Sequence, residues 1–561
     1  MTPYRWRSWP APSPPDRPQD CGSTRTSSAP RPVSADAVPP HPSPPTHLRI
    51  TTLMDRRGFL RLIAVTGAVT GAGLALGACA TEDGGANGTG TGTGSGTGGD
   101  GGTVRVAAMV SPGDTLDPAA ATSPGAWVGI FALYDSLVVL LDNEPVSQLA
   151  ESITSNDAAD VWTVRLRPDA TFSDGSPVTA EDALASLVYT AASPMAGSFL
   201  APLDTAASRT VDERTLELHL SAPRADFVEA VLAPQSGVFK DGDPDSGIGS
   251  GPFVLESGSS EDGWVFTPNP HHPGVGIDRL EVWSVPDPDA RARAVVSGDV
   301  DYANDLPVTA ARTVAEPARI TEGGPADSKA LGLILNTRVA PFDDERVRTA
   351  FKLLVDRETL VGTVLGQGAV VGEDVLGKGI SGYPDELSEI SRDVDRARSI
   401  LAEAGVDDLT LVTSDVVPGL NDAAELLVTQ AREVGLTLTL ERRDPAAYFA
   451  DIPGLMELPL FSLYWVNRST ATALPFTTGT AGGFNLDGFG ADAAWDRRLA
   501  DAAAITDDAE RQAAVAALAT EVSERGGQLI WGYQPFLNAT TDAAGDVPSS
   551  QSAPFFGSRP D

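Results

Sequence analysis

A run of glycine, threonine and serine divides this chain into two very different parts. Most residues of 82–100 are Gly, Thr or Ser, a composition that behaves as a flexible coil. The G-x-G spacings inside the run have no strand before them and no helix directly after them, so they do not indicate a nucleotide-binding loop. The roughly 460 residues from Thr103 onward must therefore form the folded body, and two or more lobes are expected for that length.

The segment before this tether has the pattern of an export signal. The paired arginines Arg56 and Arg57 precede a short apolar run at 62–78, and Cys79 follows it. This pattern resembles a twin-arginine lipoprotein signal, and the resemblance implies that Cys79 carries a lipid as the first residue of the mature protein. A transmembrane helix is the alternative, but these 17 residues are short and weakly apolar against the roughly 20 that a span needs.

The first 53 residues do not fit an export signal. They are crowded with Pro, Ser and Arg and lack apolar periodicity, so they cannot build a core. We therefore expect 1–53 to be a wrongly assigned leader, 54–78 to be the signal, and 79–102 to be the lipidated cysteine with its tether. Such a linker reaches roughly 25–30 Å, which would hold the body close to the outer face of the cell membrane, attached to it only by lipid.

Charge and cysteine content limit the partners and the covalent chemistry. The chain has 76 Asp and Glu against 40 Lys and Arg, a net charge of −36. Nucleic acid and anionic lipid would be repelled, so neither is expected as a direct partner. We interpret the acidity as a contribution to solubility. Because Cys21 lies in the predicted leader, the mature chain would keep Cys79 alone, and the body must rely on its own core rather than on a disulfide.

Apolar periodicity predicts a mixture of strands and helices in the first half of the body. Alternating apolar and polar residues predict strands at 104–110, 162–166 and 216–220. A helix is expected over 126–137. Another is expected to begin at Thr179, whose spacing to Asp182 is that of a capping box, and to end near residue 191.

The second half alternates helices with strands. One helix has its apolar face at i, i+3, i+4, i+7 and i+8, formed by Val347, Ala350, Phe351, Leu354 and Val355. Asp343 is the expected N-cap of this helix. Further helices are expected at 394–404, 422–434 and 508–524, and strands at 409–413 and 436–441. This alternation favours an α/β lobe.

Nine short sequence motifs occur one after another along the folded body. They are YDSLV at 134–138, LAES at 149–152, WTVRLRP at 162–168, FSDGSPVTAED at 172–182, GSGPF at 249–253, SGDVD at 297–301, LNT at 335–337, PFDDERVR at 341–348 and LAEAG at 401–405. Together they resemble the solute-binding proteins of peptide, dipeptide and nickel ABC importers, the oligopeptide-binding class. Turn and cap residues dominate these motifs, so they indicate a scaffold and do not identify a ligand.

The resemblance implies an α/β, two-lobed, periplasmic-binding-protein-like fold of type II. Lobe I would comprise 103–141, 246–330 and 535–561, with an extra subdomain at 142–245, and lobe III would comprise 331–534. A peptide or peptide-like solute that touches both lobes would favour a closed state. The resemblance also implies that the partners of the closed protein are ABC permease and ATPase subunits. It further implies that the protein is a monomer that lies outside the cytoplasm.

Two segments are expected to contact the ligand, one from each lobe. The loop after the first strand presents backbone groups in relatives, and here it contains Ser123, Gly125 and Trp127. The second segment, in lobe III, contains Tyr464, Trp465, Asn467 and Arg468. Asn485 matches a family position near the cleft, although capping of a turn explains it equally well.

The second segment departs from the family pattern. In the dipeptide and oligopeptide binders an acidic residue there pairs with the free amino group of the ligand, whereas this chain has Asn467 and Arg468. A guanidinium favours carboxylate or phosphate over ammonium. We therefore hypothesise that Arg468 points into the cleft and selects an anionic group, or that the ligand enters in another orientation. A solvent-facing loop arginine is the alternative. Trp465 either stacks on the ligand or packs in the core.

Other functions have weaker support in the sequence. His271 and His272 are adjacent in a loop, so their side chains point apart, and neither a metal nor a cofactor is expected. No G-x-S-x-G elbow indicates a hydrolase, and His219 occupies the polar face of a predicted strand. We therefore do not expect an enzyme. The same fold used for sensing or for a chaperone-like role stays open as an alternative to transport.

Overall fold

The computed structural model describes residues 102–558, except 194–195, 367, 381, 385, 388–389 and 551. The predicted leader, the export signal, Cys79 and the tether up to residue 101 lie outside these residues. A search of the described residues finds no helix that is both long and apolar enough to cross a membrane.

One large sheet is built around the first strand of the body. In the described part of the chain it has seven strands in the order β12-β19-β11-β1-β10-β9-β8. These strands are β1 (Thr103–Ala108), β8 (Phe253–Ser259), β9 (Gly263–Pro268), β10 (Arg279–Ser284), β11 (Tyr302–Ala303), β12 (Arg319–Glu322) and β19 (Leu537–Thr540). Its associated helices are α2 (Pro124–Leu133), α4 (Pro288–Ser297) and α5 (Val308–Ala311). Because β1 pairs in parallel with both β10 and β11, the sheet joins segments that are far apart in the sequence.

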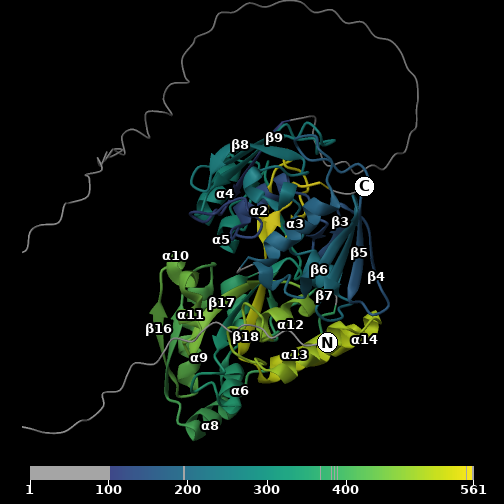
Figure 1. Cartoon of the computed structure of the whole chain (residues 1–561). Coiled ribbons are helices and arrows are strands. Elements are labelled where there is room, and N and C mark those ends of the chain that lie inside the picture. The colour runs from purple at the N-terminus through teal and green to yellow at the C-terminus, as the bar shows by residue number, and fades with distance from the viewer. Residues whose placement is uncertain are drawn as a thin grey trace, which may run out of the picture. The chain divides into compact units, whose positions relative to one another are not determined.

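A second large sheet organises the later part of the chain (Figure 1). Among the described residues its order is β14-β18-β13-β17-β15-β16. The strands are β13 (Ser328–Leu335), β14 (Val370–Val371), β15 (Asp408–Thr413), β16 (Thr437–Arg442), β17 (Leu460–Val466) and β18 (Gln528–Pro535). The helices are α6 (Glu345–Leu354), α7 (Arg357–Leu360), α8 (Val394–Ala404), α9 (Leu420–Glu433), α10 (Pro445–Tyr448), α11 (Ile452–Leu455), α12 (Thr470–Thr478), α13 (Ala493–Ala503) and α14 (Asp508–Arg525). Strands β15 and β16 are parallel, as βαβ patterning predicts, whereas β13, β17 and β18 pair antiparallel.

A smaller sheet comes between β1 and β8 of the seven-stranded sheet in the sequence. Its order is β4-β5-β7-β6, and helix α3 (Ala180–Ala191) follows β5 in the chain. The strands are β4 (Ala150–Ser155), β5 (Val161–Leu166), β6 (Leu203–Asp212) and β7 (Thr215–Leu220). The hairpin of β2 (Val138–Leu141) with β3 (Glu144–Ser147) precedes it, and a short pair of β20 (Ser549–Ser550) with β21 (Ala553–Pro554) ends the described chain. Short 3-10 or π turns occur at Ala196–Ser198, Val228–Leu232, Lys240–Gly242, Pro244–Ser246, Val361–Leu365 and Phe449–Asp451.

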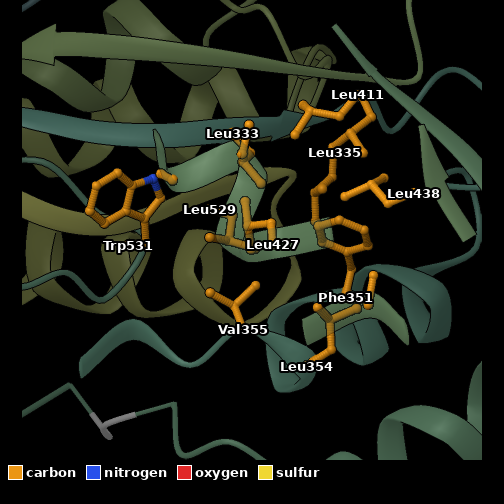
Figure 2. Close-up of a cluster of buried hydrophobic side chains, with 14 of the residues drawn as sticks. Leu333, Leu335, Phe351, Leu354, Val355, Leu411, Leu427, Leu438, Leu529 and Trp531 are labelled. Carbon is orange, nitrogen blue, oxygen red and sulfur yellow. The ribbon is translucent and has the colours of Figure 1, made fainter. Parts of the chain in front are cut away.

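Leucine-rich packing holds the six-stranded sheet to its helices. In Figure 2 the side chains of Leu333 and Leu529, from neighbouring strands, lie close to Leu427 of α9. Phe351 of α6 is fully buried in the same cluster. The helical spacing of the apolar residues at 347–355 is therefore the spacing of the buried face, which is why this helix could be predicted.

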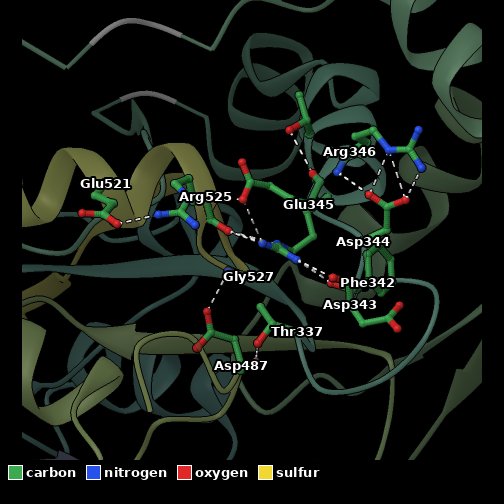
Figure 3. Close-up of polar contacts among 12 residues, drawn as sticks. Thr337, Phe342, Asp343, Asp344, Glu345, Arg346, Asp487, Glu521, Arg525 and Gly527 are labelled. Atoms are coloured by element: carbon green, nitrogen blue, oxygen red, sulfur yellow. Dashed lines mark hydrogen bonds and ion pairs between the residues drawn. The ribbon is translucent and has the colours of Figure 1, made fainter. Parts of the chain in front are cut away.

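A polar network fixes the start of α6 to the end of α14 (Figure 3). Arg348 is buried, and its Nη1 donates to the Phe342 carbonyl at 2.7 Å while its Nε and Nη2 donate to the Arg525 carbonyl at 2.9 and 2.7 Å. The carboxylate of Asp487 accepts the Gly527 N–H at 2.7 Å. These bonds satisfy a buried guanidinium and a buried carboxylate, each of which would otherwise cost stability.

Two short segments carry the chain between the two large sheets. They are residues 323–327, between β12 and β13, and Phe536, between β18 and β19. We call them the crossing segments. They lie side by side, because the Gly323 N–H donates to the Phe536 carbonyl at 3.0 Å and the Phe536 N–H donates to the Asp327 carbonyl at 3.1 Å. The yellow strand β18 in Figure 1 leads into this crossing.

Most predicted elements are confirmed, and the differences have local causes. The Thr179–Asp182 capping box is present with both of its hydrogen bonds. The N-cap expected at Asp343 is wrong, because the side chain of its neighbour Asp344 accepts the Arg346 N–H instead. The helix expected at 126–137 is also shifted. It begins at Pro124, a favourable first-turn residue, and ends at Leu133, since the apolar residues that follow enter strand β2.

Candidate functional site

A polar cavity lies where the β2–β3 hairpin, one crossing segment, the end of β17 and helix α14 meet. It contains about 1120 Å³ of empty space, part of it open to solvent. The β2–β3 hairpin contributes Asn143 and Glu144, the crossing segment contributes Asp327, and the chain from the end of β17 into α12 contributes residues 466–469 with 471–472. Residues from α14 and from the β20–β21 pair complete the lining.

Arg468 brings an unpaired positive charge to this cavity. Its Nε makes one long bond, 3.4 Å, to the Val466 carbonyl, and no carboxylate of the described residues forms an ion pair with it. The guanidinium carbon lies 5.4 Å from the ring centre of Phe199 and 5.2 Å from that of Phe476. Burial lowers the pKa of Arg468 to about 10, so the group stays charged at neutral pH.

The helix that follows Arg468 directs its N-terminus to the same cavity. Ser469 is the N-cap of α12, and its side chain accepts the Thr472 N–H at 3.3 Å. No hydrogen bond within the described chain uses the N–H of Ala471, a cavity-lining residue in the first turn. A free N–H at a helix N-terminus attracts negative charge.

Asn467 lines the cavity, but its amide is fully engaged with backbone. Its Oδ1 accepts the Gly377 N–H at 2.8 Å, and its Nδ2 donates to the carbonyls of Pro325 and Lys378, both at 2.9 Å. These bonds tie the end of β17 to one crossing segment. The geometry favours a positioning role at the crossing, and a direct contact of Asn467 with ligand stays a prediction.

The aromatic residues of β17 lie behind the cavity. Trp465 is 8% exposed, and its ring packs against Phe476 and Phe484. Its indole Nε1 is buried and has no partner among the described residues. Tyr464 is half-buried, with its ring 6.2 Å from that of Phe449. Neither aromatic lines the polar cavity, and a ligand role for Tyr464 and Trp465 stays a prediction.

The other expected ligand segment lies away from the polar cavity. Ser123 is fully buried and bonds to Asp114, and the Gly125 N–H donates to the Met109 carbonyl at 2.9 Å. A Cβ at Gly125 would approach that carbonyl oxygen to 2.8 Å, so the close backbone contact itself requires glycine there. Trp127 is half-buried against Phe131. A ligand role for Ser123, Gly125 and Trp127 stays a prediction.

Asn485 shapes a turn. Its Oδ1 accepts the Gly488 N–H at 2.9 Å, and its Nδ2 donates to the carbonyls of Thr478 and Phe489 at 2.7 and 3.0 Å. The turn-capping interpretation therefore explains this residue without a ligand.

Three acidic residues of the cavity lining were not expected from the sequence. They are Glu144 of the β2–β3 hairpin, Glu229 of the turn at Val228–Leu232 and Asp327 of the crossing segment. In a chain with 76 acidic residues no spacing singles these out. Only the topology, which brings three distant segments together, identifies them.

The ionisation of Asp327 makes the stability of the folded protein depend on pH. Burial raises the pKa of its carboxyl to about 6, and the nearby charges of Asp142 and Asp305 add to this rise. A raised pKa means that the folded state takes up a proton at a pH where the unfolded state does not. The resulting stabilisation is present at low pH and is lost as the pH rises through about 6.

We expect stability to increase when the pH is lowered from 7 to 5. Asp327 should contribute about 1 kcal/mol to this change, since a carboxyl with a pKa of about 6 takes up most of one proton between pH 7 and pH 5. The pKa of buried Asp135 is also raised to about 6 and contributes in the same direction. Thermal unfolding measured at pH 7, 6 and 5 checks this, and Asp327→Asn should flatten the slope. An equal slope in that variant would contradict the assignment.

The histidines have structural partners. The His272 ring Nε2 lies 2.8 Å from Ser558 Oγ, and His219 Nε2 lies 2.8 Å from Glu217 Oε1. The His271 ring lies close to the turn glycine Gly175. Within the described ranges no group of three or more His, Cys, Asp or Glu side chains could hold a metal ion.

Two large sheets joined by two crossing segments, with a cavity beside one of these segments, are the architecture of a two-lobed solute-binding protein. The family of bacterial extracellular solute-binding proteins, family 5 Middle, matches residues 144–485, more than half of the chain. The chain belongs to this family, whose members are periplasmic or extracytoplasmic. The predicted fold class, α/β with two lobes, is confirmed by the structural neighbours described next.

Relatives and structural neighbours bind different solutes. The "Probable D,D-dipeptide-binding periplasmic protein DdpA" of Escherichia coli is 26% identical over 353 residues, which are 58% of this chain and 68% of that protein. Helicobacter pylori DppA in complex with the peptide STSA has a TM-score of 0.68 at 18% identity, over 79% of this chain and 94% of that one. Campylobacter jejuni NikZ in complex with Ni(L-His) has a TM-score of 0.68 at 17% identity, over 81% and 96%. These neighbours share the fold, and the fold does not determine the cargo.

Proposed function

We propose that this protein is the lipid-anchored substrate-binding subunit of an ABC importer. It captures a peptide or peptide-like solute between lobe I and lobe III and delivers it to a membrane permease. The observation that carries this proposal is the polar cavity, whose lining comes from the β2–β3 hairpin, a crossing segment and the β17–α12 segment. A solute in that cavity touches both sides of the crossing and therefore stabilises the closed arrangement.

The lobes are proposed to follow the predicted segments, with the crossing segments as the hinge. Lobe I is 103–141, 246–330 and 535–561, the subdomain is 142–245, and lobe III is 331–534. The two hydrogen bonds between the crossing segments support this assignment, because a hinge needs few residues and a fixed axis. The hairpin residue Asn143 also donates to the Ala326 carbonyl at 2.9 Å, so the subdomain reaches the hinge directly.

Anchoring through Cys79 completes the proposal. A lipid on Cys79 and a flexible tether would keep the protein beside the permease while leaving its lobes free to close. Family membership supports an extracytoplasmic location, and the motif around Cys79 supports the lipid.

Uptake in the producing bacterium tests the proposal. Deletion of the gene should abolish uptake of the solute class that raises the unfolding temperature of the purified protein, because a ligand that binds only the folded state stabilises it by mass action. Expression of the wild-type gene should restore uptake, and Cys79→Ser should restore it only weakly. Unchanged uptake after deletion would contradict transport, and a lost transcriptional response with normal uptake would favour sensing.

A further inference from the structure

The polar cavity borders a second, more apolar cavity. The second cavity contains about 1290 Å³ of empty space and includes Phe199, Leu474 and Phe476 in its lining. Both cavities share Ala471 and Thr472 at the start of α12, together with Val515 of α14. The charged and the apolar compartments therefore meet at the first turn of α12.

Arg468 lies at this junction. It lines the polar cavity, while its guanidinium covers the rings of Phe199 and Phe476, which line the apolar one. These two ring contacts restrict the orientation of the guanidinium. Its Nη atoms have no hydrogen bond within the described chain, so their donors are available to a ligand.

Two independent groups at this point favour negative charge. One is the Arg468 guanidinium, whose fork geometry matches a carboxylate. The other is the N-terminus of α12, where the N–H of the lining residue Ala471 has no acceptor in the described chain. A carboxylate placed here receives charge-assisted bonds and the field of the helix dipole.

Most of the other charged residues that line the polar cavity are acidic. Glu144, Glu229 and Asp327 line it without an ion pair among the described residues, and the further cation of the lining, Arg511, pairs with Asp508 at 2.5 Å. A ligand with a second anionic group would be repelled by these carboxylates, whereas an ammonium group would be attracted. The lining therefore distinguishes a zwitterion from a polyanion.

We propose that the solute is a zwitterion whose carboxylate binds Arg468 and the first turn of α12, with an apolar group in the second cavity and its cationic end toward the acidic lining. This inference rests on the proposed function and names its substrate class. For a short peptide, the C-terminal carboxylate and an apolar C-terminal side chain occupy the junction. Arg468 is then the residue that determines which end of the ligand binds at this junction.

Calorimetric titration of the purified full-length protein tests this inference. The probes are a set of tripeptides with apolar C-terminal residues, each prepared as the free zwitterion, as the C-terminal amide and as the N-acetyl derivative, with citrate and inorganic phosphate as polyanions. We expect the zwitterions to bind at least tenfold more tightly than the amides and several-fold more tightly than the N-acetyl peptides, and we expect the polyanions not to bind.

Substitution of Arg468 separates a ligand contact from a structural role. Arg468→Met keeps the apolar stem of the side chain and removes an unpaired, half-buried charge, so the unfolding temperature should not fall, while the preference for free acid over amide should disappear. Arg498→Met is the matched control. Arg498 also stacks on a ring, that of Trp495 at 4.8 Å, but it pairs with Glu521 outside both cavities, so affinity should be unchanged.

Each alternative result is informative. Equal binding of acids and amides, or an unchanged preference in Arg468→Met, overturns the inference and leaves the proposed function standing. Preferential binding of phosphate or citrate overturns the zwitterion assignment. If no probe binds, the inference and the peptide-like cargo both fail, and the uptake experiment alone then decides whether transport of another solute remains.

Discussion

Asp374→Ala should destabilise the six-stranded sheet and its helices by about 3–5 kcal/mol, the cost that follows when a buried ion pair loses one partner. Asp374 is fully buried, and its carboxylate lies 3.1 Å from Lys352 Nζ and 2.8 Å from Arg357 Nη1. Both cationic side chains are only 4% exposed. Without Asp374, two buried positive charges would face each other with no compensating carboxylate, and burial already lowers the pKa of Lys352.

Hydrogen exchange is the appropriate measurement, because a two-lobed protein need not unfold in one step. Amides of β13 and β18 should exchange faster in Asp374→Ala by the factor that corresponds to this free energy. Asp395→Ala provides the control. Its partner Arg398 lies at 2.6 Å, but both side chains are largely exposed, and such pairs contribute about 0–1 kcal/mol. Equal effects of the two substitutions would contradict the structural role of Asp374.

Phe351→Ala should cost about 3–5 kcal/mol through loss of packing and the cavity that remains. Phe351 is fully buried on α6, and its ring packs edge-on against Phe342 at a centroid distance of 5.5 Å. Figure 2 shows it in the cluster that joins α6 to the six-stranded sheet. Because residues of α6 and β13 belong to the same cluster, the backbone amides of β13 should also exchange faster with solvent in this variant.

An exposed apolar residue provides the comparison for Phe351. Leu255 on β8 is 41% exposed, so Leu255→Ala should change stability by no more than about 0.5 kcal/mol. Hydrogen exchange of β13 measures the first variant and thermal unfolding measures both. A loss below 1 kcal/mol in Phe351→Ala would mean that neighbouring side chains collapse into the space, contrary to the close packing described here.

Local patterns predicted most of the elements because they report directly on burial. The spacing of Val347, Phe351 and Leu354 marks the buried face of α6, and Thr179 with Asp182 marks the start of α3. Errors occurred where two residues satisfy the same rule. Asp343 and Asp344 are both good N-caps, and only the three-dimensional path of the chain decides between them.

The site was less predictable, because its residues meet only through topology. Arg468 was singled out by its departure from the family pattern, and it does line the cavity. Asn467 has the right position, yet its amide is consumed by backbone groups of Pro325 and Lys378. Asp327 carries no sequence signal, since its raised pKa arises from burial at a crossing that no local pattern encodes.

Native mass spectrometry of the protein from its own cells tests the central claim, capture of a small solute in the interlobe cavity. The wild-type protein should retain a bound solute, and Ala471→Trp, which fills the junction of the two cavities, should retain none at an unchanged unfolding temperature. Retention of the same solute by both forms would place its site elsewhere. A wild-type protein without any solute, together with no thermal shift from any class of solute, would contradict the account.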